Sequence, residues 1–373
     1  MPAPGDDTLG DFDSLKQMLT SSADVGTHLI RVYQYVIARF DVDGFRIDTL
    51  RYLKGGLALT FGNAVREYAL SIGKKNFFTF GEVWAGDAED EIARFIGRNT
   101  NAGGDLVGVD AALDYPLFDV LKAAVKGFGA PREVMAMYQR RKFVEKDILS
   151  SHGDATRYFV TFLDNHDVKA WLRHADAAAQ AELDLEVSLG IACLACLPGI
   201  PCIYYGTEQG LHGAGSDPAV REALWGGPGL DDSSRFYAVL SRIAAVRAME
   251  PALRYGRIYF RQLSSNGVAF GFSGFRPGVL AFSRILNDRE MLVVANFDKS
   301  AGQRLNVVVD ATLNPVGRAL RVLFSNLEVA PAALSAVRQL SGVTVEEVDG
   351  SISDGPVNAI QLELRVGEVL MLT

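Results

Sequence analysis

The sequence feature that most constrains the fold is a series of short apolar runs that each end in acidic residues. Gly44–Ile47 leads into Asp48, Phe77–Phe80 into Gly-Glu, and Tyr158–Leu163 into Asp-Asn-His-Asp. Helical patterns separate the runs, and such alternation is typical of parallel βα units. A (β/α)8 barrel carries its catalytic groups at the carboxyl ends of its strands, and a doubly wound open sheet follows a similar rule. The pattern predicts an α/β fold with active residues after the strands, and position alone leaves both architectures open.

Apolar residues at helical spacing predict the helices between the runs. In Ala23–Phe40, for example, Leu29, Val32, Val36 and Phe40 recur on one helical face. Further helices are expected at Phe61–Ile72, Asp90–Ile96, Leu117–Val125, Leu183–Leu197 and Ser233–Met249, and further strands at Val107–Leu113 and Cys202–Tyr205.

The pattern changes after about Tyr255, where strand-like runs and turns rich in Ser, Asn, Gly and Asp replace the alternation. The expected strands are Arg257–Leu263, Val268–Phe272, Val279–Leu286, Glu290–Asn296, Arg304–Val309, Val343–Val348, Ala359–Leu364 and Gly367–Leu372, with one helical pattern at Ala330–Leu340. Such strands predict an antiparallel β-sandwich. We therefore predict a catalytic domain over residues 1–252 and a small β-sandwich domain over residues 253–373.

Length and composition agree with this division and exclude several functions. The chain has 373 residues, whereas single cores stop growing at about 250–300 residues. Its net charge of −8 argues against a nucleic-acid partner, because such partners require a basic surface. No window reaches the roughly 18 apolar residues that a membrane span needs. The opening residues lack the features of a signal peptide, which leaves the location open, with the cytoplasm as the default.

The three cysteines, Cys193, Cys196 and Cys202, lie within ten residues of one another. The first pair has CxxC spacing, which is compatible with a redox or metal site. No second cysteine pair or histidine pair completes a zinc set, so we predict that they fill a buried helix and strand.

Two of the strand ends suit the cleavage of a glycosidic bond, which needs one ionised and one protonated carboxyl group. Asp48 lies two residues after Arg46, on the same side of a strand because side chains alternate. A guanidinium so close favours the carboxylate form and suits a nucleophile. Glu82 has no basic neighbour in the sequence and lies beside Trp84, and an apolar wall raises a carboxyl pKa, which suits a general acid. A lone acid at a strand end is about as often a capping or ion-pairing group, so the interpretation depends on the combination.

In these residues the chain resembles the α-amylase family of glycoside hydrolases. The family's strand end GFRxD matches Arg46 and Asp48, its GE matches Glu82, and its NHD matches His166 and Asp167. A further family stretch, GxPxxYYGxE, matches residues 199–208, and the β-sandwich that follows also fits. Four motifs in the family's order make the resemblance specific.

The resemblance implies retaining cleavage of α-glucosidic bonds in starch-like α-glucans or malto-oligosaccharides. Asp48 would form a glycosyl-enzyme intermediate, and Glu82 would protonate the leaving sugar and then activate the acceptor. Asp167 would bind sugar hydroxyls more strongly in the transition state. Arg46 would keep Asp48 ionised, and His166 would bind the substrate. The aromatic residues near these motifs either stack on sugars or pack in the barrel: Trp84, Tyr204 and Tyr205.

The sequence also departs from the family pattern. Five strands are expected where the family barrel has eight, so the predicted fold is a (β/α)8 TIM-type barrel that lacks its first three strands. The DxxxNH motif and the inserted domain that supplies much of the calcium site are missing, and Arg51 and Tyr52 replace the family's Lys-His. We therefore expect no cofactor and no calcium site of the usual type. Because an open barrel leaves unpaired edge strands, we expect a fragment of a longer protein, or a partner chain that supplies the missing strands.

The sequence leaves three functional alternatives. The first is a non-catalytic relative that binds carbohydrate or acts as a scaffold, and the second is an inactive fragment of the enzyme. The third is an α-glucan transglycosidase. All three carboxylates are present, which argues against decayed catalysis. Leu211–Gly229 is expected to shape part of the sugar-binding cleft without revealing its specificity.

Overall fold

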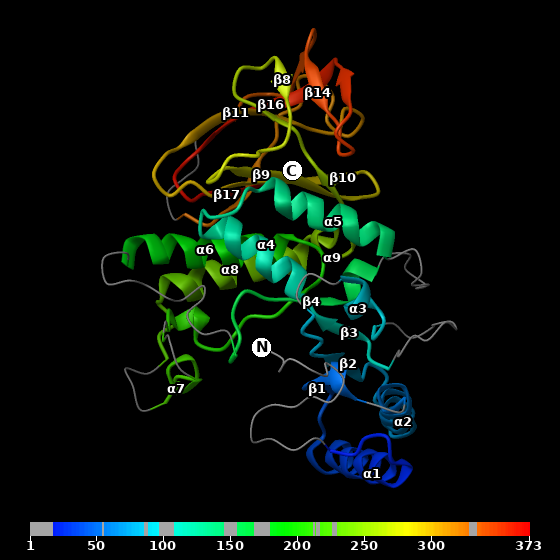
Figure 1. Cartoon of the computed structure of the whole chain (residues 1–373). Coiled ribbons are helices and arrows are strands. Elements are labelled where there is room, and N and C mark those ends of the chain that lie inside the picture. Colours follow the sequence, from blue (N-terminus) through cyan, green and yellow to red (C-terminus); the bar gives the residue numbers. More distant parts are fainter. Residues whose placement is uncertain are drawn as a thin grey trace. The chain divides into compact units, whose positions relative to one another are not determined.

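The computed structural model describes residues 18–53, 56–85, 89–96, 108–144, 155–167, 180–211, 213, 217–225, 230–327 and 334–373. The chain divides into two compact units, Met1–Pro116 with Gln139–Thr161 and Leu117–Tyr138 with Phe162–Thr373. Figure 1 labels many of their helices and strands. The boundary that the sequence predicts near residue 252 lies inside the second unit, so a division there stays a prediction.

The first unit contains a parallel β-sheet. Its strands are β1 (Gly44–Ile47), β2 (Phe78–Gly81), β3 (Ala111–Leu113) and β4 (Phe159–Thr161), in that order. Each neighbouring pair is parallel. The accompanying helices are α1 (Ala23–Phe40), η1 (Leu50–Tyr52), α2 (Leu57–Ser71), α3 (Glu89–Ala93) and η3 (Ala155–Tyr158), while α4 (Tyr115–Val125) and α5 (Arg132–Val144) extend across the division of the units. The predicted parallel βα pattern is confirmed for these strands.

Close backbone approaches explain two glycines of this unit. A Cβ atom on Gly44 would lie 2.1 Å from the carbonyl oxygen of Phe78, at the start of the β1–β2 pair. A Cβ atom on Gly62 in α2 would lie 1.5 Å from the carbonyl oxygen of Gly108. Only glycine permits such contacts, so Gly44 lets β1 and β2 pair closely, and Gly62 lets α2 approach the segment before β3.

The buried face of α1 differs from the predicted one. Val32 and Phe40 of the expected stripe are 54% and 64% exposed, whereas Ile37 is buried in a core with Leu57 and Phe61 of α2. The position of α2 selects this face, because α2 contacts the side of α1 that carries Ile37. Spacing therefore predicted the helix with its bounds, but not the side that α2 covers.

The strands after residue 256 form three sheets in the second unit (Figure 1). The first contains β12 (Val322–Ser325), β17 (Val369–Leu372), β10 (Arg289–Asn296), β9 (Val279–Leu286) and β6 (Arg257–Phe260); the second contains β13 (Arg338–Leu340), β16 (Val357–Leu364), β11 (Gln303–Val308) and β7 (Leu263–Ser264); the third contains β15 (Ile352–Asp354), β14 (Thr344–Glu346) and β8 (Ala269–Phe270). The first two sheets share one apolar core, to which Val294 and Leu370 contribute from one sheet and Val307 and Ile360 from the other. Two antiparallel sheets over one core agree with the predicted β-sandwich.

The second unit also contains the helices α6 (Gln180–Cys196), η4 (Thr207–Gln209), α7 (Asp217–Val220), α8 (Arg235–Met249) and α9 (Pro251–Tyr255), and the strand β5 (Ile200–Pro201). Cys193 and Cys196 are buried in α6, and all three cysteines carry free thiols, which agrees with their predicted packing role. Two arginines cap the carboxyl end of α6. Arg247 donates to the carbonyl of Ala195 at 2.6 Å and Arg284 to that of Cys196 at 2.8 Å, which satisfies terminal carbonyls.

Several sequence predictions of elements are wrong in place or type. The strand expected at Cys202–Tyr205 is β5 at Ile200–Pro201, and the chain then turns, because the N–H of Thr207 donates to the carbonyl of Tyr204 at 3.2 Å. Residues 338–340 form β13 instead of a helix, and residues 330–333 lie outside the described residues. The helix α5 and the strands β12 and β15 were not predicted. Among the described residues, no helix combines the length and apolar character needed to cross a membrane.

Candidate active site

Asp48 and Arg46 form the ion pair that strand alternation predicts. Arg46 Nη1 lies 2.6 Å from Asp48 Oδ1 at the end of β1. The side chain of Asp48 is 67% exposed, whereas that of Arg46 is 27% exposed. The carboxylate of Asp48 therefore meets a guanidinium on one side and solvent on another.

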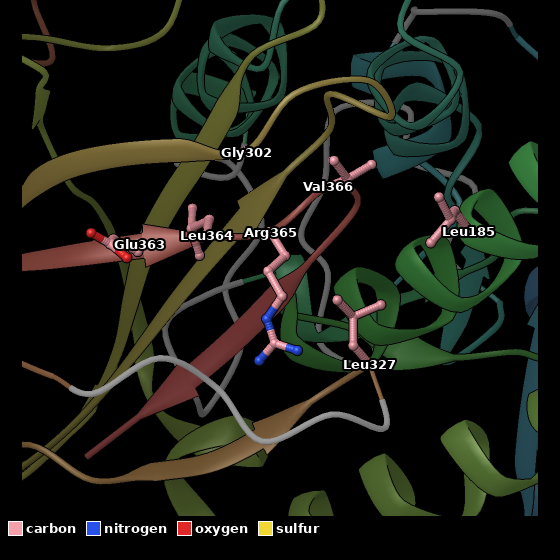
Figure 2. A pocket seen from close by; sticks show the side chains of 7 residues that line it. All are labelled: Leu185, Gly302, Leu327, Glu363, Leu364, Arg365 and Val366. Carbon is pink, nitrogen blue, oxygen red and sulfur yellow. The ribbon is translucent and has the colours of Figure 1, made fainter.

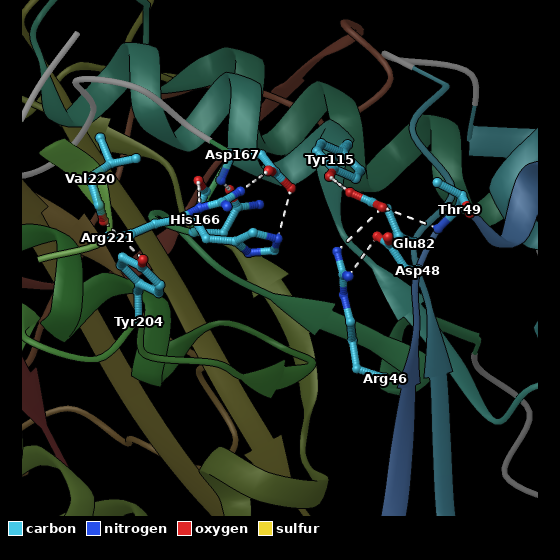
Figure 3. A network of polar contacts seen from close by, with 11 residues as sticks. Arg46, Asp48, Thr49, Glu82, Tyr115, His166, Asp167, Tyr204, Val220 and Arg221 are labelled. Atoms are coloured by element: carbon cyan, nitrogen blue, oxygen red, sulfur yellow. Dashed lines mark hydrogen bonds and ion pairs between the residues drawn. The ribbon is translucent and has the colours of Figure 1, made fainter. Parts of the chain in front are cut away.

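Glu82 lies beside this pair at the end of β2 (Figure 3). Ile47 of β1 is in register with Gly81 of β2, so the next residue of each strand is an acid. Glu82 has no basic neighbour along the sequence, but in space Arg46 Nη2 lies 3.3 Å from Glu82 Oε2. One arginine therefore contacts both acids, an arrangement that the pairing of β1 with β2 creates.

Glu82 is the most enclosed member of this group. Its side chain is only 9% exposed. Tyr115 donates its hydroxyl to Oε1 at 2.9 Å, and the backbone N–H of Thr49 donates to Oε2 at 3.3 Å. Sequence reasoning missed both donors; the signal for Tyr115 was its place after Asp114, the acid that follows the expected strand Val107–Leu113.

The pKa of Glu82 is raised above its ordinary value, chiefly by burial and then by a hydrogen bond with Asp48. Arg46, the hydroxyl of Tyr115 and the N–H of Thr49 each act in the opposite direction. The direction is the predicted one, but the cause is not the wall of Trp84. Trp84 is 54% exposed and stacks on the ring of Tyr115, with centroids 5.1 Å apart. A raised pKa suits a group that must hold a proton near neutral pH.

The backbone around the acids is tightly constrained. Thr49 has φ of 50°, a left-handed conformation that is costly for a β-branched residue, about 1–3 kcal/mol. This conformation follows Asp48 directly and accompanies the hydrogen bond from Thr49 to Glu82. A Cβ atom on Gly81 would lie 2.1 Å from Leu50 Cδ2, so glycine permits the close packing just before Glu82.

His166 and Asp167 lie in the second unit, after β4. His166 Nε2 is 3.0 Å from Asp167 Oδ2, and Arg221 Nη2 is 3.2 Å from Asp167 Oδ1. Arg221 Nε also donates to the backbone carbonyl of His166 at 3.3 Å. The predicted neighbours therefore contact each other, and Arg221 is a partner that sequence reasoning missed (Figure 3).

The loop after β5 contributes aromatic side chains. The rings of Tyr204 and Tyr205 have centroids 4.5 Å apart, and the hydroxyl of Tyr204 donates to the carbonyl of Val220 at 2.9 Å. Tyr205 is 39% exposed. Of the stretch predicted to shape the cleft, residues 212, 214–216 and 226–229 lie outside the described residues. The hydrogen bond of Tyr204 agrees with a packing role, whereas the ring of Tyr205 is accessible to solvent.

Arg51, at the place of the family's Lys-His, holds the segment after β2. Its Nε donates to Glu91 Oε1 at 2.6 Å, and its Nη1 donates to the carbonyl of Trp84 at 3.0 Å. A guanidinium that already binds these oxygens does not fit a cation there. Across the described ranges, no group of three or more His, Cys, Asp or Glu residues is arranged to hold a metal ion.

An open pocket of about 530 Å³ lies elsewhere in the second unit (Figure 2). Leu185 of α6 and Leu327, Leu364 and Val366 give it a largely apolar lining, and Arg365 adds a charge. None of the predicted site residues lines this pocket. It is therefore not part of the candidate active site.

Comparisons with known proteins agree with the motifs. The family model of the alpha-amylase catalytic domain matches residues 9–235. The alpha-amylase of Streptomyces lividans is 28% identical over 300 residues, which cover 74% of this chain and 30% of that protein. The cyclomaltodextrin glucanotransferase of Klebsiella oxytoca is 27% identical over 288 residues, 66% of this chain and 40% of that protein. The chain thus spans well under half the length of these curated relatives.

Solved structures show the same likeness of fold. The structure of an Anoxybacillus alpha-amylase superposes with a TM-score of 0.64 and 21% identity, covering 96% of this chain and 65% of that one. The debranching enzyme of Nostoc punctiforme gives a TM-score of 0.63 at 18% identity, covering 95% of this chain and 62% of that one. At these identities the likeness is one of fold.

Proposed function

Because the chain belongs to the α-amylase family, we propose that it acts on α-glucosidic bonds of starch-like α-glucans or malto-oligosaccharides. The observation that carries the proposal is the contact between an exposed aspartate and a buried, protonation-prone glutamate. Asp48 and Glu82 share a hydrogen bond and one arginine, Arg46. A retaining mechanism, which the family resemblance implies, uses two carboxyl groups that flank the reacting bond, and Arg46 contacts both of the acids proposed for it.

In the proposed reaction, Asp48 attacks the anomeric carbon while Glu82 gives its proton to the leaving glycosidic oxygen. The C–O bond to the leaving sugar breaks as the bond to the Asp48 oxygen forms. Glu82, now ionised, then removes a proton from the incoming acceptor, which displaces Asp48. Arg46 favours the ionised form of Asp48. Asp167, which Arg221 contacts, binds sugar hydroxyls with His166.

Substitution of the two acids tests this proposal. Asp48→Asn and Glu82→Gln are each expected to lower kcat on maltoheptaose by at least about a hundredfold, because each removes a group that takes part in bond exchange. The exposed acids Asp354 and Glu133, changed to Asn and Gln, are matched controls and should keep the rate. Full activity in either Asp48→Asn or Glu82→Gln would contradict the roles. NMR of the first product measures its anomeric configuration, which is expected to be the same as in the substrate.

A second candidate is transfer to another sugar rather than to water. The likeness to cyclomaltodextrin glucanotransferases favours it, since those relatives are named for transfer. Incubation of the protein with maltoheptaose and labelled glucose separates the two outcomes. Labelled oligosaccharides indicate transfer, whereas unlabelled short products alone indicate hydrolysis. Retarded migration in a starch-containing gel without any turnover would instead favour the non-catalytic, carbohydrate-binding alternative.

We further propose that another segment or a partner chain pairs with the outer edge of β1. In the described part of the chain, β1 pairs with β2 and with no other strand. Edge strands with unsatisfied backbone groups are covered in stable proteins, and α1 leaves Val32 and Phe40 exposed in the same unit. Unfolding experiments on residues 1–373 test this: a soluble monomer that unfolds cooperatively would contradict the need for a partner.

A further inference from the structure

The hydroxyl of Tyr115 is the one neutral side-chain donor among the described contacts of Glu82. Tyr115 is 2% exposed, and its donation to Oε1 at 2.9 Å is enclosed with the carboxyl group itself. Its ring is fixed as well, because it stacks on Trp84 at an interplanar angle of 13°. Both ends of the side chain are therefore held, so the hydroxyl stays aimed at one oxygen of Glu82.

A buried ion pair fixes the backbone that carries Tyr115. The preceding residue, Asp114, is fully buried and accepts two hydrogen bonds from Arg141, at 2.6 and 3.0 Å. The N–H of Asp114 donates to the carbonyl of Val160 in β4 at 2.9 Å. The guanidinium of Arg141 also lies over the ring of Phe159, 4.0 Å from its centroid. Bidentate contacts of this kind specify geometry, so the end of β3 presents Tyr115 in a defined position.

The groups that face Glu82 define what the hydroxyl does. From β1 and the turn after it come Arg46, Asp48 and the N–H of Thr49; from the start of α4 comes Tyr115. Asp48 shares a hydrogen bond with Glu82 that favours the protonated acid, and Arg46 acts against it. A hydroxyl that donates to a carboxylate stabilises the ionised form. Tyr115 therefore supports Glu82 in the state that it reaches after giving up its proton.

We propose that Tyr115 is a positioning residue that sets the upper pH limit of this site by holding Glu82 for proton transfer and stabilising its carboxylate. The proposal rests on the proposed function for its kinetic readout, since Glu82 is the group that protonates the leaving sugar there. The hydroxyl of Tyr115 makes the Glu82 carboxyl easier to deprotonate. Without this hydroxyl, Glu82 keeps its proton to higher pH. Burial favours the protonated form of Glu82, and the hydroxyl of Tyr115 favours the ionised form that the reaction also requires.

The variant Tyr115→Phe tests this proposal, because it removes the hydroxyl and keeps the ring that stacks on Trp84. In the pH profile of kcat/KM, the alkaline limb is expected to move to higher pH, and kcat at its optimum is expected to fall about tenfold. Tyr138→Phe is the matched control: Tyr138 is also buried, and its hydroxyl donates to the carbonyl of Pro198 at 3.4 Å. The control should leave the alkaline limb in place. An unchanged limb in Tyr115→Phe would overturn the proposal.

A second measurement separates this proposal from the proposed function. Carbon-13 NMR of selectively labelled glutamate carboxyls, with Glu82→Gln to identify the signal, follows the protonation of Glu82 without any turnover. The midpoint is expected to rise in Tyr115→Phe even if the wild-type chain has no activity on glucans, in which case only the proposed function fails. An unchanged midpoint in a folded Tyr115→Phe variant contradicts the role of Tyr115, whatever the activity. Circular dichroism establishes the folding of each variant.

Discussion

The two groups of candidate site residues differ in how they are held. In the first unit, Glu82 has 9% of its side chain exposed and contacts Arg46, Tyr115 and Thr49. In the second unit, Asp167 is 32% exposed, and its partners His166 and Arg221 are 38% and 47% exposed. Burial strengthens an electrostatic contact and makes its loss expensive, whereas water weakens a contact at the surface. Burial therefore acts most strongly on Glu82 in the first group, and we propose that the more exposed second group offers adjustable contacts to a ligand.

The largest expected effect comes from Arg46, which contacts both acids of the first group. Arg46→Met leaves Asp48 and Glu82 hydrogen-bonded without their cation, so the pKa of Glu82 is expected to rise further. We expect kcat/KM on malto-oligosaccharides to fall by at least about a hundredfold, comparable to the removal of a preorganised charge in other active sites. Steady-state kinetics measures this. Arg46→Lys keeps a charge but not the two-armed contact, and a fully active lysine variant would show that the shared guanidinium is dispensable.

The next effect is on stability and concerns the support behind Tyr115. Arg141→Met leaves the buried Asp114 without the guanidinium that binds it and leaves Glu89 with Arg140 at 3.7 Å, and breaking a buried pair such as Arg141–Asp114 costs about 3–5 kcal/mol. Burial already raises the pKa of Glu89, and Arg141 is the strongest group that counteracts it. Urea unfolding of the variant against wild type measures the difference. Arg140→Met is the comparison, because Arg140 also contacts Glu89, at 3.7 Å, but is 54% exposed and leaves the Arg141–Asp114 pair intact; a similar loss in both variants would contradict the special role of that pair.

How much of this the sequence predicts depends on how far apart the interacting residues are. The contact of Arg46 with Asp48 follows from alternation along a single strand and was predicted. Its contact with Glu82 depends on the register of β1 with β2, which spacing within either strand does not reveal. Arg221 is 54 positions from Asp167, and no local pattern joins the two.

The same distinction holds for the fold. The bounds of α1, β1 and β9 were predicted because their apolar patterns are long or sharply ended. The pattern of α5 was not recognised, since this helix carries several charged residues and little apolar contrast. The strand β5 contains only Ile200 and Pro201, and a two-residue strand is too short for an apolar pattern to mark its ends.

A smaller effect is expected in the pH dependence of stability. The pKa of Glu82 is raised above its ordinary value of 4.5 in the folded chain. The folded state therefore holds the proton more tightly than the unfolded state. The free energy of unfolding should fall as pH rises from 4.5 through the folded pKa, and no such loss applies well below 4.5.

Glu82→Gln removes this loss, so its stability relative to wild type is expected to increase across that pH window. Urea unfolding at a series of pH values measures the difference. Asp167→Asn provides the comparison in the second group, where a change of about 1 kcal/mol or less is expected for an exposed pair. If the stability difference for Glu82→Gln were the same at every pH, the burial of an ionisable acid at this position would be contradicted.

The smallest effect is expected at Arg221. Its contact with Asp167 lies at 3.2 Å with both side chains partly exposed, and such pairs contribute about 0.2–1 kcal/mol. Arg221→Met should therefore change stability little and lower kcat/KM by no more than about fivefold. The effect should shrink in high salt, because mobile ions screen exposed charges, whereas the effect of Arg46→Met should persist. A large, salt-independent loss in Arg221→Met would show that the second group is as preorganised as the first, and the contrast between a buried and an adjustable group would then fail.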